Sequence, residues 1–167
     1  MARVAIIMGS DSDWPILGPA VELLRQLGID SDVVVASAHR TPAKVREYVE
    51  SAPGRGIGVI IAAAGAAAHL AGVVASYTTL PVIGVPINAT PLLGLDALLS
   101  TVQMPSGVPV ATMAVNGAKN AAVFAAQIFA VSDEAIRDRL AAYRERLAQE
   151  VERKAERVAS SAGTSQV

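Results

Sequence analysis

The sequence predicts an α/β fold: a three-layer α/β/α sandwich around a parallel sheet, followed by a long C-terminal helix. Short apolar runs alternate with segments of helical periodicity over residues 4–130. A repeated order of strand, helix and strand requires crossover connections, and these make the strands parallel. The chain has 167 residues, 52% of them hydrophobic, which suits one domain with a sizeable core.

The predicted strands are five short apolar runs. The first, residues 4–8, is apolar throughout, as expected for a strand that is covered by helices on both faces. The other four are expected at residues 32–36, 57–63, 81–85 and 108–115.

Capping residues mark the ends of the predicted helices. Ser or Asp in the loop 9–13 is expected to cap the first helix, which ends at Gly28. Thr41 is expected to cap the second helix, with proline in its first turn. The last helix is expected over residues 132–159, with Ser132 as its cap. Its apolar stripe comprises Ile136, Leu140, Tyr143, Leu147 and Val151.

The charges are concentrated in this last helix. Residues 133–157 hold 14 of the 29 charged side chains, whereas Asp96 is the only one between Gly56 and Ala118. Because a monomer surface normally carries charge throughout, the pattern predicts a homo-oligomer in which the helix 132–159 packs on neighbouring subunits. The alternative is a monomer whose surface is rich in glycine and alanine.

Composition excludes several classes of protein and site. A net charge of -1 gives no basic face for a nucleic acid or an anionic membrane. Without cysteine there is no disulfide, thiol catalysis or cysteine-bound zinc. The apolar stretch 59–75 is rich in glycine and alanine and contains His69, which argues against a membrane span. The first residues lack the pattern of a signal peptide, so we expect a cytoplasmic protein with one domain over residues 1–159 and a disordered tail, 160–167.

Three loops are candidates for the functional site. Ligands of an open parallel sheet bind beyond the carboxyl ends of its strands. The loops that follow the first three predicted strands cover residues 9–13, 37–41 and 64–69. The two histidines of the chain, His39 and His69, are therefore expected at the same edge of the sheet.

The first two loops form a candidate phosphate site. Ser10 and Ser12 lie with backbone N–H groups at a helix N-terminus, which suits an anion. Arg40, with Ser37 three residues before it, is suited to clamp a phosphate. Asp13 would accept hydrogen bonds from sugar hydroxyls. The alternatives are helix capping alone for the first loop and a surface salt bridge for Arg40.

His39 is the candidate proton-transfer group, because imidazole changes its charge near neutral pH. His69 would bond a carbonyl or a ligand, or fill a subunit interface. The loops lack a carboxylate cluster for magnesium, a P-loop lysine and a catalytic serine–histidine–acid set. The residues thus indicate a site that holds a sugar phosphate and moves protons.

The sequence closely resembles the bacterial N5-carboxyaminoimidazole ribonucleotide mutases of purine biosynthesis, the catalytic subunits of phosphoribosylaminoimidazole carboxylase. The family's motifs occur in order over residues 3–130 and comprise GSDSD at 9–13, SAHRTP at 37–42, GAAAHL at 65–70, GLDALLS at 94–100 and VQMP at 102–105. Two segments, 87–91 and 115–120, depart from the usual pattern.

The resemblance implies a flavodoxin-like fold, a homo-octamer and no metal or other cofactor. The implied reaction converts 5-carboxyamino-1-(5-phospho-ribosyl)imidazole to 5-amino-1-(5-phospho-ribosyl)imidazole-4-carboxylate in IMP biosynthesis. The resemblance further implies functional coupling to the ATP-dependent synthetase that carboxylates N5. His39 would be the general acid and base. The implied substrate-binding residues are Ser10, Ser12, Asp13, Ser37, Arg40, Gly65, His69 and Leu70.

The expected mechanism uses one imidazole twice. His39 protonates N5, the N-carboxylate leaves as carbon dioxide, C4 attacks the carbon dioxide, and His39 removes the C4 proton. A pocket of small residues at 63–67 is expected to keep the carbon dioxide away from water.

Three other functions stay open at this point. Some family members carboxylate the aminoimidazole directly with carbon dioxide, and that branch commonly carries lysine after the histidine, where Arg40 stands here. A phosphoacceptor receiver module would need an aspartate at the end of the third strand, where residues 62–64 are alanines. A flavin carrier would need aromatic residues, of which Trp14 is the only candidate near the site.

Overall fold

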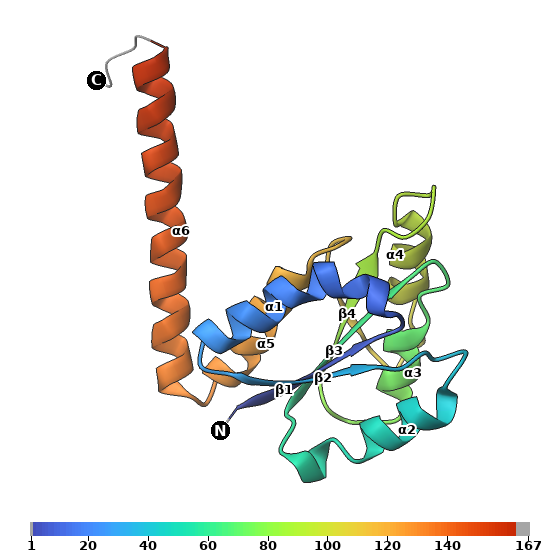
Figure 1. The fold of residues 1–167 in the computed structure, drawn as a ribbon. Helices are drawn as coiled ribbons and strands as arrows, with labels where there is room; N and C mark the ends of the chain where they lie inside the picture. The colour runs from blue at the N-terminus through green and yellow to red at the C-terminus, as the bar shows by residue number, and fades with distance from the viewer. Residues whose placement is uncertain (1, 163–167) are drawn as a thin grey trace.

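A computed structural model describes residues 2–162 and contains one five-stranded sheet (Figure 1). All strand pairs are parallel, and the order across the sheet is β2-β1-β3-β4-β5. This order is that of flavodoxin-like folds, so the predicted fold class is confirmed. The strands are β1 (Arg3–Met8), β2 (Asp30–Val35), β3 (Val59–Gly65), β4 (Val82–Ile87) and β5 (Ala111–Thr112).

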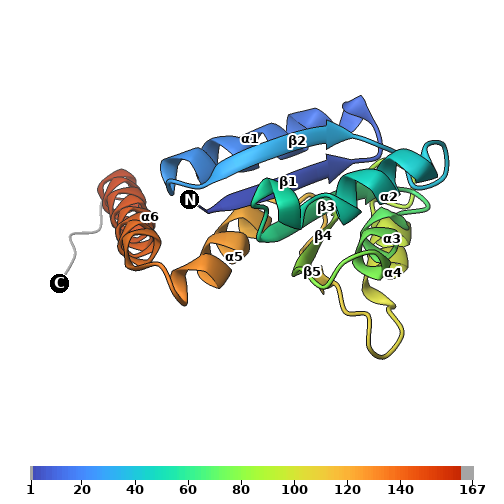
Figure 2. The ribbon, with the colours of Figure 1, turned by 90° about the horizontal axis from the view of Figure 1, so that it is seen from below.

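Helices cover both faces of the sheet. Figures 1 and 2 show α1 and α5 on one face and α2, α3 and α4 on the other. The helices are α1 (Trp14–Gln26), α2 (Pro42–Glu50), α3 (Leu70–Ser76), α4 (Leu95–Val102), α5 (Ala118–Ala130) and α6 (Glu134–Ser161), with short 3-10 turns at Asp11–Asp13 and Pro53–Arg55. As predicted for a glycine stop, Gly28 follows α1 with a φ of 76°.

Alternate residues of β1 pack on opposite faces of the sheet. Val4, Ile6 and Met8 belong to the core shared with α1 and α5. Ala5 and Ile7 belong to the core shared with α2 and α3. All five side chains are buried. Because strand side chains alternate with a period of two, a strand covered on both faces must be apolar at every position.

Three predicted strands have boundaries that differ in ways that matter for the site and the sheet edge. The strands β3 and β4 continue two residues past their predicted ends, to Gly65 and Ile87. The fifth strand, predicted over residues 108–115, consists of Ala111 and Thr112 alone. Pro109 precedes it and has no N–H to donate to a neighbouring strand, which limits pairing on this side.

The last helix begins and ends later than predicted. Asp133, and not Ser132, is its N-cap, because the Asp133 carboxylate accepts the N–H of Ile136 at 3.1 Å. The helix continues through Ser161, so residues 160 and 161 of the predicted tail are helical. Residues 163–167 of that tail lie outside the described residues.

The helix α6 packs on the domain through its first turns only. Ile136 and Leu140 are buried in the core beside α5. Beyond them the helix extends away from the sheet (Figure 1), and Leu147, Val151 and Val158 are exposed. Within residues 2–162, no helix combines the length and the apolar character needed to cross a membrane.

Asp133→Ala is expected to lower the free energy of unfolding by about 1 kcal/mol, the usual contribution of such a helix cap. Ser132→Ala is the matched control, because the Ser132 hydroxyl only reaches the Phe129 carbonyl at 3.5 Å. Chemical denaturation of the two variants measures the difference. Equal losses of stability would contradict the assignment of Asp133 as the cap.

Candidate active site

The three predicted loops meet because the strands that precede them are neighbours in the sheet. Met8 pairs with Val35 on one side and with Ala63 on the other. The backbone continues this pairing into the loops, where the N–H of Gly9 donates to the Ala63 carbonyl at 3.2 Å. The loops lie where the strand order reverses between β1 and β3, which is where open α/β sheets bind ligands.

A pocket of about 340 Å³ opens between these loops. Each predicted site residue except His69 lines it. The lining comprises Gly9, Ser10, Ser12, Asp13, Ser37, Ala38, His39, Arg40, Ala64, Gly65, Ala66, Ala67, Leu70 and Ala89.

The pocket lining differs from the prediction at two residues, Ala63 and Ala89. Ala63 does not line the pocket: it is fully buried in the core beside α1 and α5, because it lies on the opposite side of the strand from Ala64. Ala89 does line the pocket and was not predicted. It follows β4, which ends two residues later than the sequence indicated.

The first loop is held by its own side chains. The Ser10 hydroxyl accepts the N–H of Ser12 at 3.3 Å, and the Asp13 carboxylate accepts the N–H of Ser10 at 3.3 Å. Together these bonds form a capping box. The same residues therefore cap a helical turn and line the pocket, so the two interpretations of this loop do not compete.

Asp13 is a buried carboxylate. The residue is only 5% exposed to solvent. Burial raises the pKa of the Asp13 carboxyl above its usual value, and the charge of Asp11 adds to this, while hydrogen bonds from Ser10 and Ser12 oppose it. An ionised Asp13 is thus held at a cost to stability, as is common for groups that bind ligands.

Arg40 joins the second loop to the first. Its Nη2 donates to the Gly9 carbonyl at 3.0 Å, and its backbone N–H donates to the Ser37 hydroxyl at 3.2 Å. Among residues 2–162 its guanidinium forms no ion pair, contrary to the salt-bridge alternative. The positive charge of Arg40 is therefore available to an anion in the pocket.

Thr41 is the N-cap residue of α2, with Pro42 at the first helical position, as predicted, but its side chain makes no cap bond to the helix. Its hydroxyl instead accepts the N–H of Ser37 at 2.9 Å and donates to the Ser37 carbonyl at 3.2 Å. These two bonds close the loop 37–41 on itself. They fix the backbone that carries His39 and Arg40.

His39 and His69 contact each other. The Nε2 of His39 lies 3.0 Å from the Nδ1 of His69, and the two rings are nearly perpendicular, at 86°. A contact of this length requires a hydrogen on one nitrogen and a lone pair on the other. The contact couples the tautomers of the two rings, and of the two histidines only His39 lines the pocket.

The third loop brings backbone close to the pocket. Ala66 has a φ of 53°, in the left-handed region that side chains other than glycine rarely adopt. In the described part of the chain, the N–H groups of Ala66 and Ala67 donate no hydrogen bond. Successive free N–H groups in such a turn suit a carboxylate or another anion.

The sequence and the fold match those of known proteins over nearly the whole chain. The profile of the AIR carboxylase family matches residues 3–150. The N5-carboxyaminoimidazole ribonucleotide mutase of Thermotoga maritima is 54% identical over 158 residues, which are 95% of this chain and 92% of that protein. The mutase of the same name from Saccharolobus solfataricus is 55% identical over 145 residues, or 87% of this chain and 92% of that protein. The crystal structure of Treponema denticola PurE aligns with a TM-score of 0.83 at 29% identity, over 94% of this chain and 98% of that one.

Asp13→Asn is expected to stabilise the substrate-free protein at neutral pH, because the amide removes a buried charge and still accepts the N–H of Ser10. Since the pKa is raised on folding, the folded state binds the proton more tightly than the unfolded state does. Wild-type stability therefore falls as the pH rises from 3.8 through the folded-state pKa. The melting temperature of the variant is expected to rise above that of the wild type over that pH range. The difference is expected to remain at higher pH.

Asp11→Asn is the control for this measurement, because Asp11 is an exposed carboxylate in the same loop. Its melting temperature is expected to rise much less than that of Asp13→Asn, because the charge of Asp11 is the smallest of the causes that act on the Asp13 pKa. An Asp13→Asn protein that gains no stability at neutral pH would contradict the account of Asp13.

Proposed function

The chain belongs to the AIR carboxylase family, and on that basis we propose that it is an N5-carboxyaminoimidazole ribonucleotide mutase of purine biosynthesis. Such an enzyme is an isomerase, which moves a carboxylate from N5 to C4 of one aminoimidazole ring. The observation that carries the proposal is a pocket in which a histidine, an arginine and two loops of hydroxyls meet in a chain 54% identical to a mutase.

The polar half of the pocket suits the ribose phosphate. Arg40 supplies a charge that no carboxylate of the described chain neutralises, and the hydroxyls of Ser10, Ser12 and Ser37 surround it. Phosphate oxygens accept hydrogen bonds from such groups. Asp13 has an acceptor oxygen for the ribose hydroxyls. These contacts would hold the base still while the carboxylate moves.

His39 is the proposed general acid and base. Protonated His39 gives its proton to N5, the bond between N5 and the carboxylate carbon breaks, and carbon dioxide and the aminoimidazole form. C4 then bonds to the carbon dioxide, and the C4 proton returns to His39. His69 would act through His39: its contact at 3.0 Å supports a role in holding the ring toward the pocket.

The apolar half of the pocket suits the carbon dioxide. Small residues line it from Ala64 to Ala67, and Leu70 closes one side. Such an apolar surface offers water few hydrogen bonds, which would favour attack by C4 over hydration of the carbon dioxide. The free N–H groups of Ala66 and Ala67 would then donate hydrogen bonds to the carboxylate that forms on C4.

Direct carboxylation of the aminoimidazole is the second candidate, because the family profile carries the name AIR carboxylase. The two are separated by offering the purified protein either the N5-carboxylated ribonucleotide or the aminoimidazole ribonucleotide with bicarbonate, both without ATP. We expect rapid turnover of the first substrate. Rapid turnover of the second alone would support the carboxylase.

We propose that the chain forms one domain over residues 1–159 and assembles into a homo-octamer in the cytoplasm. Two features support assembly: the exposed stripe on α6 and the near absence of charge between Gly56 and Ala118. In this assembly α6 packs on a neighbouring subunit. Functional coupling to an ATP-dependent synthetase that carboxylates N5 would supply the substrate.

His39→Asn is expected to reduce kcat by about 10²- to 10⁴-fold, the usual contribution of a general acid and base. Nucleotide affinity is expected to change little, because the phosphate contacts lie on other side chains. Trp14, the single tryptophan, directly follows Asp13 in the sequence, so its fluorescence is used to measure binding. Turnover close to that of the wild type would end the assigned role of His39.

Val151→Glu is expected to reduce the mass of the assembly without unfolding the subunit, because Val151 is 61% exposed and lies on the apolar stripe of α6. Gln149→Glu adds the same charge two residues away, on a different side of the helix, and is expected to leave the mass unchanged. Sedimentation velocity measures both. An unchanged mass for Val151→Glu would contradict the proposed packing of α6.

A further inference from the structure

The pocket has a fourth wall that the three predicted loops do not supply. It is the segment 88–94, which joins β4 to α4, and its Ala89 lines the pocket. This segment lies very close to β3, because a Cβ at Gly65 would come 2.5 Å from the Ala89 Cβ. The width of the pocket at Gly65 therefore depends on where the segment is held.

Thr90 links the middle of this segment to the first turn of α4. Its hydroxyl donates to Oδ2 of Asp96 at 2.8 Å and accepts the N–H of Leu92 at 3.2 Å. The beginning of the segment is held separately, since the N–H of Asn88 donates to the side chain of Asn116 at 2.9 Å. Loss of the Thr90 hydroxyl would thus remove the side-chain bonds at the middle of the segment and leave there only backbone bonds, such as that from the N–H of Leu93 to the Thr90 carbonyl at 3.1 Å.

The surroundings of Asp96 are costly for a carboxylate. In the described residues its second oxygen, Oδ1, is buried and has no hydrogen-bond partner. An unsatisfied buried acceptor lowers stability. Leu93 adds strain in the same segment, with a φ of 55° and a side chain that is 75% exposed. Such costs are typical of segments that a functional site holds in a fixed shape.

We propose that Thr90 and Asp96 are positioning residues of the active site, whose hydrogen bond keeps Ala89 against Gly65 and so retains carbon dioxide in the pocket. The inference rests on the proposed function, in which carbon dioxide is free in the pocket between two bond changes. N5 takes up the proton of His39, the bond between N5 and the carboxylate carbon breaks, and aminoimidazole ribonucleotide and carbon dioxide form. If the carbon dioxide escapes before C4 attacks it, the enzyme releases aminoimidazole ribonucleotide instead of the isomer.

Thr90→Val tests the inference, because valine has nearly the shape of threonine and no hydroxyl. The variant is expected to raise the ratio of released aminoimidazole ribonucleotide to isomer about fivefold, the factor that corresponds to loss of the hydrogen bond from Thr90 to Asp96 alone. KM is expected to change little, since the phosphate contacts lie on other loops. Both products are measured from the N5-carboxylated substrate and corrected for its decay without enzyme. Thr90→Ser restores the hydroxyl and is expected to restore the wild-type ratio.

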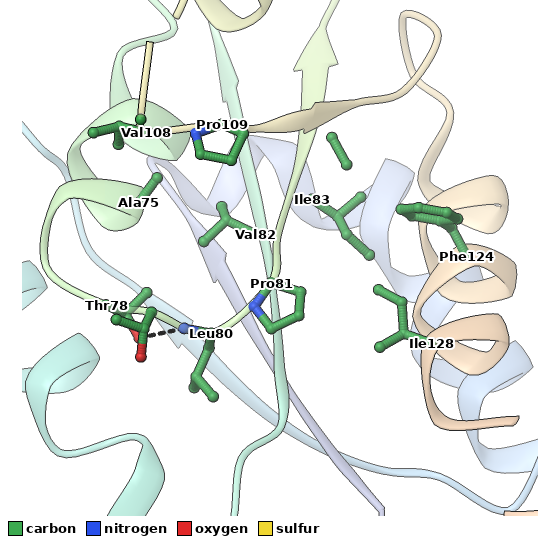
Figure 3. Close-up of a pocket in the computed structure, with 13 residues that line it drawn as sticks. Ala75, Thr78, Leu80, Pro81, Val82, Ile83, Val108, Pro109, Phe124 and Ile128 are labelled. Carbon is green, nitrogen blue, oxygen red and sulfur yellow. Dashed lines mark hydrogen bonds between the residues drawn. The ribbon is translucent and has the colours of Figure 1, made fainter. Parts of the chain in front are cut away.

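Thr78→Val is the matched control. The Thr78 hydroxyl accepts the N–H of Leu80 at 3.1 Å, much as Thr90 accepts that of Leu92. It lies before the amino end of β4, beside an apolar groove of about 530 Å³ at the other edge of the sheet (Figure 3). This variant loses a comparable hydrogen bond far from the pocket, so its product ratio is expected to equal that of the wild type.

Asp96→Ala breaks the same contact from the other side and serves as the second variant. Because the two residues act through one bond, the double variant Thr90→Val with Asp96→Ala is expected to have a product ratio no higher than the higher of the two single variants. A folded Thr90→Val or Asp96→Ala enzyme with the wild-type product ratio would overturn the inference. A Thr90→Ser enzyme whose product ratio is raised as much as that of Thr90→Val would overturn it as well. A wild-type protein that forms no isomer would instead overturn the proposed function.

Discussion

The register of the parallel strands is the constraint on which the site depends. Met8 pairs with Val35 and Ala63, so the loops beyond these three residues emerge at one edge of the sheet. A slip of one residue in β1 would exchange the side chains that pack in the two cores and would shift the loop after β1 relative to the other two loops. Burial of the central strands therefore builds the core and assembles the pocket together. His39 and His69, thirty positions apart in the chain, meet as a result.

Several local costs lie around this pocket, although the buried Nε atoms of Arg3 and Arg55, which have no hydrogen-bond partner among the described residues, lie elsewhere. Asp13 is a buried carboxylate, Asp96 keeps one buried oxygen without a partner among the described residues, and Ala66 and Leu93 hold left-handed backbone. Such features persist only where the surrounding structure outweighs them. The apolar strands and the alanine-rich face of α5 supply that stability. The enzyme thus trades some stability for a pocket of defined shape, which is the usual relation between a site and its scaffold.

Much of this arrangement follows from the sequence, because strand ends and polar loop residues have strong local signals. The order of apolar runs predicts the sheet, and the rule for carboxyl ends brings Ser10, His39 and Arg40 to one place. The contact of His39 with His69 is not predictable in this way, since it depends on how the backbone turns after β3. Ala89 carries no chemical signal at all, and its place in the pocket follows from where β4 ends. Capping was misassigned where two candidates adjoin, because a single hydrogen bond decides between Ser132 and Asp133.

The central claim is that the carboxylate passes from N5 to C4 without leaving the pocket. The most direct test supplies substrate labelled with ¹³C in the N5-carboxylate to the wild-type enzyme, in buffer with an excess of unlabelled bicarbonate and carbon dioxide. The account predicts that the isomer keeps the label at C4 at nearly the enrichment of the substrate. An isomer whose carboxylate has the isotopic composition of the dissolved pool would contradict it.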